Sequence, residues 1–251
     1  DWTGRTEARP VQQLIYWICM HLVARMADTY LVPTRRFWPY LPKKRTAEVV
    51  TGCIAIPPEQ ECAAPPPLYI LYAGKVEREH GIVQFVEALD MLDRLPAAAR
   101  LHVDICGAGP MTGWVAERLG RLSVLSATQH GFVTSAEYAT LLGKAHVCVA
   151  LQDPGGRNAD FKTPSKIYEF LGHGKAVIAT KVGDIGEIPE QALIILQGLS
   201  AEEIAEHLDR LAKQPDQAAT LQAKAREHAI EAFSYETVGR TLAMLVRGTA
   251  T

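Results

Sequence analysis

The fold is decided by the stretch "TPSKIYEFLGHGKAVIATKVG", residues 163–183. Thr163 suits the N-cap of a helix and Pro164 its first helical position, and the Gly-His-Gly at 172–174 predicts where that helix ends. The apolar run at 176–179 then predicts a buried strand. A short helix that leads into a buried strand is one unit of an α/β fold.

Around this unit, strand-like and helix-like runs alternate along the chain. Strands are predicted at "LYILYAG" (68–74), "LHVDICGAGP" (101–110) and "HVCVAL" (146–151), and helices at "IVQFVEALDML" (82–92), "MTGWVAERLGRL" (111–122), "VTSAEYATLLGKA" (133–145) and "SAEEIAEHLDRLAKQ" (200–214). Because these strands are nearly continuous apolar runs between helices, we expect a doubly wound parallel sheet with helices on both faces.

The part before residue 68 has a different pattern. Residues 11–31 predict a helix, "VVTGCIAIPP" (49–58) predicts a strand, and the Pro-rich "ECAAPPP" (61–67) predicts a linker. Between the helix and the strand lies "RRFWPYLPKKR" (35–45), a basic and aromatic loop. Such a loop is either solvated or packed on a domain, or it contacts a membrane surface peripherally.

Composition excludes several classes of protein. The 251 residues are 48% hydrophobic and 22% charged, which is typical of a folded globular protein and excludes extensive disorder. Five widely spaced cysteines without a CxxC pair favour reduced thiols in a cytoplasmic protein over a zinc site or a disulfide framework. The longest charge-free stretch, residues 10–24, is shorter than the ~20 residues of a membrane span. The net charge is −2, and we expect no nucleic-acid partner.

The start of the decisive helix has the chemistry of an anion site. The first turn of a helix presents free backbone N–H groups, and Lys166 adds a positive charge beside Ser165, so a phosphate fits there. Glu169 lies on the same helical face, where a carboxylate can accept hydrogen bonds from two adjacent sugar hydroxyls. The alternative is an ordinary capped helix with Lys166 and Glu169 as an exposed pair.

Ligands of such sheets bind where the loops after the strands gather. The turn "GAG" at 107–109 is one of these loops, but Thr112 stands where a dinucleotide fingerprint needs its third glycine. We therefore interpret it as a tight turn.

Taken in order, four segments resemble the donor-binding domain of family 4 glycosyltransferases, which are retaining, nucleotide-sugar-dependent enzymes of the GT-B fold. These segments are "YAGKVEREHGIVQFVEAL", "LHVDICGAGP", "GFVTSAEYATLLGKAHVCVAL" and "PSKIYEFLGHGKAVIATKVGDIGE". The resemblance implies a Rossmann-like domain at 68–225, preceded by a remnant helix and strand of a truncated N-terminal acceptor domain (1–60) and the linker (61–67). Residues 226–251 resemble the closing helix that packs back across the domains.

The resemblance also implies roles for individual residues. Glu169 would hold the ribose of the donor nucleotide, and Lys75 with the helix start at Ser165 and Lys166 would hold the diphosphate. Lys75 and His80, which stands where the family has a second basic residue, would be catalytic; for His80 a solvated loop position is the alternative. The remaining donor contacts expected from the matched loops are Gly74, Gly107 and Phe132.

The implied activity is glycosyl transfer from a nucleotide diphosphate sugar, which is a substrate and not a cofactor, to a glycan, lipid or small-molecule acceptor. No Asp-x-Asp pair occurs in the candidate loops, so we expect lysines in place of a metal. Two departures stand out: Phe161 replaces the first glutamate of the family's paired motif, and most of the acceptor domain is missing from the sequence. The alternatives are therefore a non-catalytic nucleotide-binding module and a GT-B-type epimerase or phosphorylase.

Overall fold

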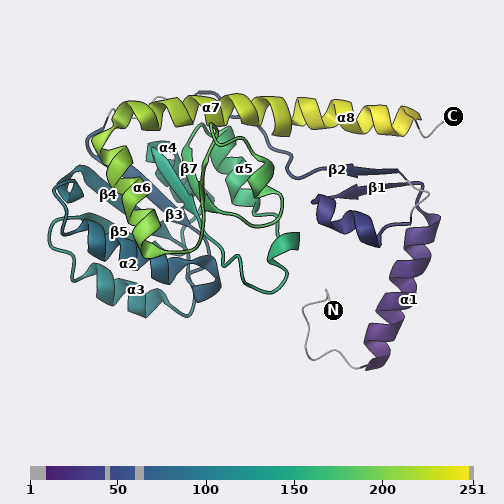
Figure 1. Ribbon diagram of the computed structural model, residues 1–251, viewed down its shortest axis with the longest axis horizontal. Coiled ribbons are helices and arrows are strands. Elements are labelled where there is room, and N and C mark those ends of the chain that lie inside the picture. Colours follow the sequence, from purple (N-terminus) through teal and green to yellow (C-terminus); the bar gives the residue numbers. More distant parts are fainter. Residues whose placement is uncertain (1–9, 43–45, 60–64, 249–251) are drawn as a thin grey trace.

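The computed structural model describes residues 10–42, 46–59 and 65–248 and contains a six-stranded parallel sheet between two layers of helices (Figure 1). The strand order is β5-β4-β3-β6-β7-β8. The strands are β3 (Leu68–Ala73), β4 (Leu101–Cys106), β5 (Ser126–Gly131), β6 (Val147–Ala150), β7 (Ala176–Thr180) and β8 (Ile194–Leu196). This arrangement confirms the predicted doubly wound α/β fold.

The helices cover both faces of the sheet. One face packs against α2 (Ile82–Leu92), α3 (Thr112–Leu119) and α6 (Ala201–Lys213), and the other against α4 (Ser135–Lys144), α5 (Ser165–Gly172) and α7 (Pro215–Phe233). Side chains of the central strand β3 alternate between the two cores, with Ile70 and Leu71 both fully buried. Because side chains on both faces of the sheet are buried, the sequence of a central strand such as β3 is a continuous apolar run.

Strand β5 is absent from the sequence-based prediction. Its sequence, SATQHG, has few β-branched or large apolar residues, and its side chains alternate between exposed and half-buried. A polar edge strand of this kind contains no hydrophobic run from which a strand could be predicted.

The N-terminal part also differs from expectation. Helix α1 (Pro10–Met26) ends five residues before the predicted limit, because residues Thr29–Val32 form strand β1, which pairs in parallel with β2 (Thr46–Val49). A helix and two strands therefore stand where a helix and one strand are predicted. Residues 50–58, all within the described part, form no strand beyond a single bridge at Ile54.

That bridge explains a break between the last two helices. Helix α7 ends at Phe233 and α8 (Tyr235–Gly248) begins after Ser234, whose neighbours bond to the backbone of Ile54: Ile54 N–H donates to Phe233 O and Tyr235 N–H donates to Ile54 O. Helix α8 then continues past the sheet toward β1 and β2 (Figure 1).

The basic and aromatic loop packs on the protein. Residues Arg35–Tyr40 form a 3₁₀ helix whose Phe37 and Tyr40 rings contact Phe161, with ring centroids 5.1 and 6.0 Å apart. Asp184 caps the same turn, since its carboxylate accepts from Thr34 Oγ1 at 3.0 Å and from the Arg35 N–H at 2.9 Å. These contacts favour the packed form of the loop; its last residues, 43–45, and residues 61–64 of the predicted linker lie outside the described residues.

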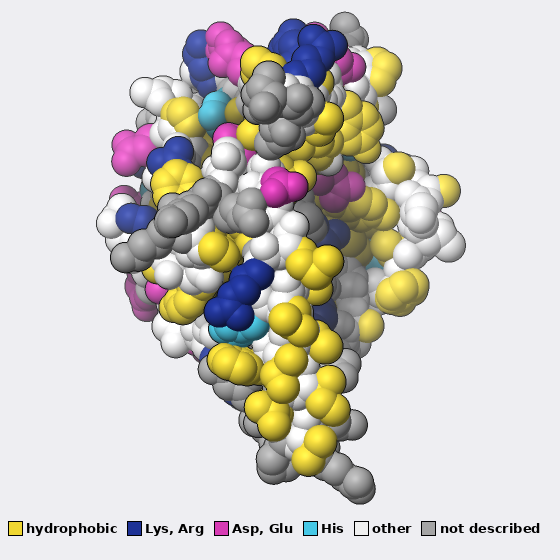
Figure 2. Space-filling view, turned by 90° about the vertical axis from the view of Figure 1, so that its right-hand side faces the viewer, with side chains coloured by type: hydrophobic (Ala, Val, Ile, Leu, Met, Phe, Trp, Pro, Cys, Tyr) yellow, Lys and Arg dark blue, Asp and Glu magenta, His cyan; other side chains and the backbone are white. Residues whose placement is uncertain are grey.

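Helix α1 projects away from the rest of the chain (Figure 1) and is apolar on its surface (Figure 2). Leu14 and Leu22 are 56% and 55% exposed, and Ile15, Trp17, Val23 and Met26 are exposed as well. No helix within the described residues is both long enough and apolar enough to cross a membrane.

Candidate active site

The candidate site lies where the strand order reverses. From β3 the chain moves outward to β4 and β5, and then returns beside β3 to form β6, β7 and β8. At such a point the loops after β3 and β6 diverge to opposite faces and leave a crevice at the carboxyl ends of the strands.

Two adjoining hollows of about 570 and 220 Å³ occupy this crevice, and Gly74, Lys75 and Lys166 line both. The larger hollow is also lined by Cys106, Gly107, Ala108, Phe132, Val133, Thr134, Ser135 and Tyr138, and the smaller by His80, Gln152, Pro164 and Ser165. Seven of the eight predicted site residues therefore line one continuous crevice; the eighth, Glu169, reaches it through Tyr138.

The loops after β3 and β4 are joined backbone to backbone. Val76 N–H donates to Ala108 O at 3.1 Å, and Gly107 has a left-handed φ of 130°. A Cβ atom at Gly107 would lie 1.7 Å from the Gly74 carbonyl oxygen. The turn 107–109 is therefore glycine-rich because two loops touch there, in keeping with its interpretation as a tight turn.

Lys75 and His80 share one carboxylate. Glu77 Oε1 lies 3.6 Å from Lys75 Nζ and 3.1 Å from His80 Nε2. Burial lowers the pKa of His80, and Lys75 and Lys162 lower it further against the opposing effect of Glu77. Glu77, which the sequence-based assignment omits, places a negative charge beside both predicted phosphate ligands.

Tyr72 fixes the loop that carries both residues. Its hydroxyl lies 2.9 Å from the carbonyl oxygens of Lys75 and of His80. Burial and then the Glu77 charge raise the pKa of Tyr72, so that the hydroxyl stays protonated and able to donate. The phosphate-binding candidates are thus held from inside the core.

Helix α5 begins one residue later than predicted. Pro164, not Thr163, occupies the N-cap position of α5, without a side-chain cap hydrogen bond. The Thr163 hydroxyl is buried with no hydrogen-bond partner among the described residues. Since proline has no N–H, the first donors of the helix are the amides of Ser165 and Lys166, both of which line the crevice.

Glu169 lies one turn further along α5 and is held by Tyr138. The Tyr138 hydroxyl donates to Glu169 Oε2 at 2.9 Å, and Lys166 Nζ lies over the Tyr138 ring, 4.6 Å from its centroid. Glu169 is therefore not paired with Lys166 as an exposed surface couple. Tyr138 is absent from the predicted site, because the sequence alone does not show that the Tyr138 hydroxyl on α4 lies within hydrogen-bond distance of Glu169 on α5.

Phe132 stands at the mouth of the larger hollow. It follows β5, is 91% exposed, and leads into the capping box that Thr134 and Glu137 form at the start of α4. A planar, exposed ring beside a cleft is suited to stacking on a flat ligand.

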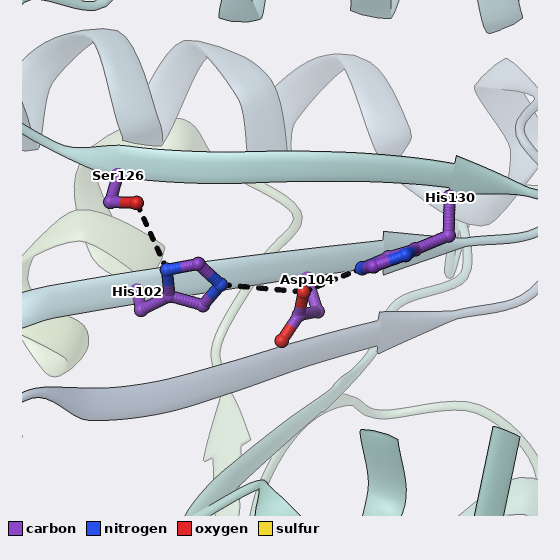
Figure 3. A network of polar contacts seen from close by, with 4 residues as sticks. All are labelled: His102, Asp104, Ser126 and His130. Carbon is purple, nitrogen blue, oxygen red and sulfur yellow. Dashed lines mark hydrogen bonds and ion pairs between the residues drawn. The ribbon is translucent and has the colours of Figure 1, made fainter. Parts of the chain in front are cut away.

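A second polar cluster joins β4 and β5 (Figure 3). Asp104 is buried and accepts at Oδ1 from His130 Nε2 at 2.6 Å, with His102 Nε2 3.4 Å away, while His102 Nδ1 lies 2.9 Å from Ser126 Oγ. None of the four lines the two hollows. Within the described residues no group of three or more His, Cys, Asp and Glu is arranged to hold a metal ion.

Comparison with known proteins identifies the family to which the sequence belongs. A family model described as glycosyl transferase-like matches residues 78–243. A search of curated proteins finds no match to the sequence.

Solved structures of similar fold include three from bacteria. HepE from Anabaena in complex with UDP has a TM-score of 0.75 at 15% identity, over 94% of this chain and 68% of that one. Sucrose-phosphate synthase from Thermosynechococcus elongatus has a TM-score of 0.68 at 18% identity, over 99% of this chain and 64% of that one. The pneumococcal O-GlcNAc transferase GtfA in complex with UDP and GlcNAc has a TM-score of 0.67 at 14% identity, over 93% of this chain and 47% of that one.

At these identities the likeness shows the fold alone, which is the Rossmann-like α/β fold of the GT-B type expected from the sequence. The chain spans between 47% and 68% of the length of these three structures.

Proposed function

Since the chain belongs to the glycosyl transferase-like family, we propose that it binds the nucleotide sugar donor of a retaining glycosyl transfer reaction of the family 4 type. The observation that carries this proposal is the meeting of Lys75, Lys166 and the Glu169–Tyr138 pair at the switch point of the sheet. Two of the similar structures contain UDP, which makes a uridine nucleotide the first ligand to test.

In this proposal each part of the crevice binds one part of the donor. The diphosphate lies at the start of α5, against the amides of Ser165 and Lys166 and the side chains of Lys75 and Lys166. The ribose hydroxyls donate to Glu169, and the base lies in the larger hollow beside Phe132. Gly74, which has open space where a side chain would lie, leaves the backbone open to the ligand, and Gly107 lines the same hollow.

The reaction breaks the bond between the anomeric carbon and the phosphate oxygen. The nucleoside diphosphate leaves with the bonding electrons, an acceptor hydroxyl forms the new bond, and its proton is released. Lys75, Lys166 and a protonated His80 stabilise the negative charge that develops on the leaving phosphate.

We propose that this chain supplies the donor side only and that the acceptor, whether a glycan, a lipid or a small molecule, is held by a partner domain. Residues 1–60 would belong to that acceptor domain, and residues 68–225 with the closing segment 226–251 to the donor domain. A cytoplasmic location and peripheral membrane contact through residues 35–45 stay predictions. The chain by itself is expected to bind a nucleoside diphosphate without turnover.

The test is calorimetric titration of UDP, ADP and GDP into the wild type and into Glu169→Ala and Glu169→Gln. Because alanine leaves the ribose hydroxyls without an acceptor, Glu169→Ala should weaken nucleotide binding by about 10- to 100-fold, whereas the amide of Glu169→Gln should retain part of it. Equal affinities for wild type and Glu169→Ala would show that Glu169 is a surface residue.

Turnover is tested separately, with labelled nucleotide sugars and the protein together with its acceptor domain. Nucleotide binding without any transfer to an acceptor would favour the non-catalytic module. With inorganic phosphate added as acceptor, formation of a sugar 1-phosphate together with the free nucleoside diphosphate would favour the phosphorylase. A changed sugar configuration would favour the epimerase.

A further inference from the structure

Tyr138 contacts the proposed ribose ligand, Glu169, and the proposed diphosphate ligand, Lys166. Its hydroxyl is bonded to Glu169 and its ring to the Lys166 ammonium. It also lines the larger hollow itself, so any ligand there lies beside it.

The position of Tyr138 is fixed by the start of α4. Thr134 and Glu137 form a reciprocal capping box, in which Glu137 Oε2 accepts from the Thr134 N–H at 2.7 Å. The Tyr138 N–H closes the first turn by donating to Thr134 O at 2.9 Å. The ring is thus presented to α5 from a rigid backbone.

The Tyr138 hydroxyl is a permanent donor. Burial raises the pKa of Tyr138, and the charge of Glu169 together with their hydrogen bond raises it further. A carboxylate has room for about four hydrogen bonds, so one bond at Oε2 leaves acceptors for two ribose hydroxyls.

We infer that Tyr138 is a positioning residue of the donor site. Its hydroxyl holds the Glu169 carboxylate in the orientation that the ribose meets, and its ring holds Lys166 by a cation–π contact beside the diphosphate. Without Tyr138, the Glu169 and Lys166 side chains would be free to change rotamer in the unbound protein. Ligand binding would then have to order them, and the affinity for the ligand would fall. This inference rests on the proposed function.

Two substitutions separate the two contacts. Tyr138→Phe removes the hydroxyl and keeps the ring, whereas Tyr138→Leu removes both. Tyr235→Phe is the matched control, because Tyr235 is exposed at the start of α8. Thermal unfolding of each variant checks that the fold is intact.

Three ligands test the ribose and diphosphate parts of the site separately: UDP, its 2′,3′-dideoxy analogue, which lacks the ribose hydroxyls, and inorganic pyrophosphate, which lacks the nucleoside. Tyr138→Phe should weaken UDP by about 5-fold, since one hydrogen bond that orders a charged acceptor is lost, and should leave the dideoxy analogue and pyrophosphate unchanged. Tyr138→Leu should weaken pyrophosphate as well. Tyr235→Phe should match the wild type throughout.

The outcomes distinguish this inference from the proposal beneath it. If the wild type prefers UDP to the dideoxy analogue and Tyr138→Phe keeps that preference in full, the inference is wrong and the donor site stands. The inference is also wrong if Tyr138→Phe weakens all three probes equally, which would indicate a purely structural role. A wild type that binds UDP and the dideoxy analogue equally well would overturn the ribose role of Glu169 and this inference together.

Discussion

His80 is the residue at which pH should control ligand binding. In the free protein burial lowers its pKa from the ordinary value of 6.5, so His80 is mostly neutral at pH 7. A bound diphosphate would favour the protonated form and raise that pKa. The sign follows: nucleotide affinity should be greatest below the pKa of the free protein and should fall as pH rises through the pKa of the complex.

Calorimetry with UDP across pH, corrected for titration of the phosphate itself, measures this dependence. His80→Lys should bind with a flat profile and keep its affinity at high pH, and His80→Ala should be flat at a weaker level. If the curves for wild type and His80→Ala superimpose, His80 is a solvated loop residue that does not contact the phosphate. The phosphate would then be bound by Lys75 and the start of α5 alone.

At this scale the sequence predicts residues that carry their chemistry in local order. Ser165, Lys166 and Glu169 lie within two turns of one helix, and Lys75 directly follows a buried strand. Glu77 lies in the same loop as Lys75 and His80, two residues after the first and three before the second, but no motif identifies a carboxylate at that position as a site residue. Tyr138 becomes a site residue only through its contact with Glu169 of another helix, and no spacing in the sequence indicates that contact. The same holds for His102 and His130, which meet at Asp104 from two different strands.

At the scale of elements, Asp93 joins the end of α2 to the start of β5. Its carboxylate accepts from the Val124 and Leu125 N–H groups at 2.7 and 2.6 Å and from the Ser123 N–H at 2.8 Å. Burial is the largest single effect and raises the pKa of Asp93, but the three backbone N–H bonds and the Ser123 hydroxyl together lower it more, and the result is well below the ordinary 3.8.

Because the folded pKa is depressed, this stabilisation is present above the unfolded pKa and is lost as pH falls through the folded one. Asp93→Asn should lower the free energy of unfolding at pH 7 by about 1 kcal/mol, a figure reduced for solvent screening, and the deficit should shrink in acid. Urea unfolding at a series of pH values measures it. A deficit that stays constant down to pH ~2 would contradict the hydrogen-bond explanation.

The contact between the loops after β3 and β4 leads to a second prediction at this scale, which concerns the free energy of unfolding. Gly107→Ala would place a Cβ against the Gly74 carbonyl in a left-handed conformation, and should lower the free energy of unfolding by about 2–4 kcal/mol. Gly113 is the control: it lies inside α3 with open space around it, so Gly113→Ala should be neutral or stabilising by up to ~1 kcal/mol. Equal losses in urea unfolding would exclude the close approach as the cause.

Elements with strong periodicity are predictable, and those shaped by tertiary contacts are not. The buried strands β3, β4, β6 and β7 and the helices between them follow from apolar runs. The early end of α1 and the break at Ser234 depend on pairing with β2 and with Ile54, which lie far away in the sequence.

For the whole molecule, the apolar surface of α1 should dominate its behaviour in solution. Exposed apolar area of this extent binds hydrophobic dyes and promotes association. The double substitution Leu14→Gln and Leu22→Gln should reduce dye fluorescence and concentration-dependent association without changing the unfolding midpoint. Val124→Gln, at a lone exposed apolar residue outside α1, should leave dye binding unchanged. Dye binding that survives the double substitution would place the apolar surface elsewhere.

The strand order has a consequence for how this protein avoids aggregation. An open parallel sheet has two edges, and each is a template onto which another chain could add a strand. One edge is β8, which is only three residues long. The other is β5, whose polar side chains include His130, bonded to the buried Asp104 carboxylate of β4, so that an incoming strand would meet a polar edge rather than an apolar ladder. Both edges therefore discourage amyloid-like growth.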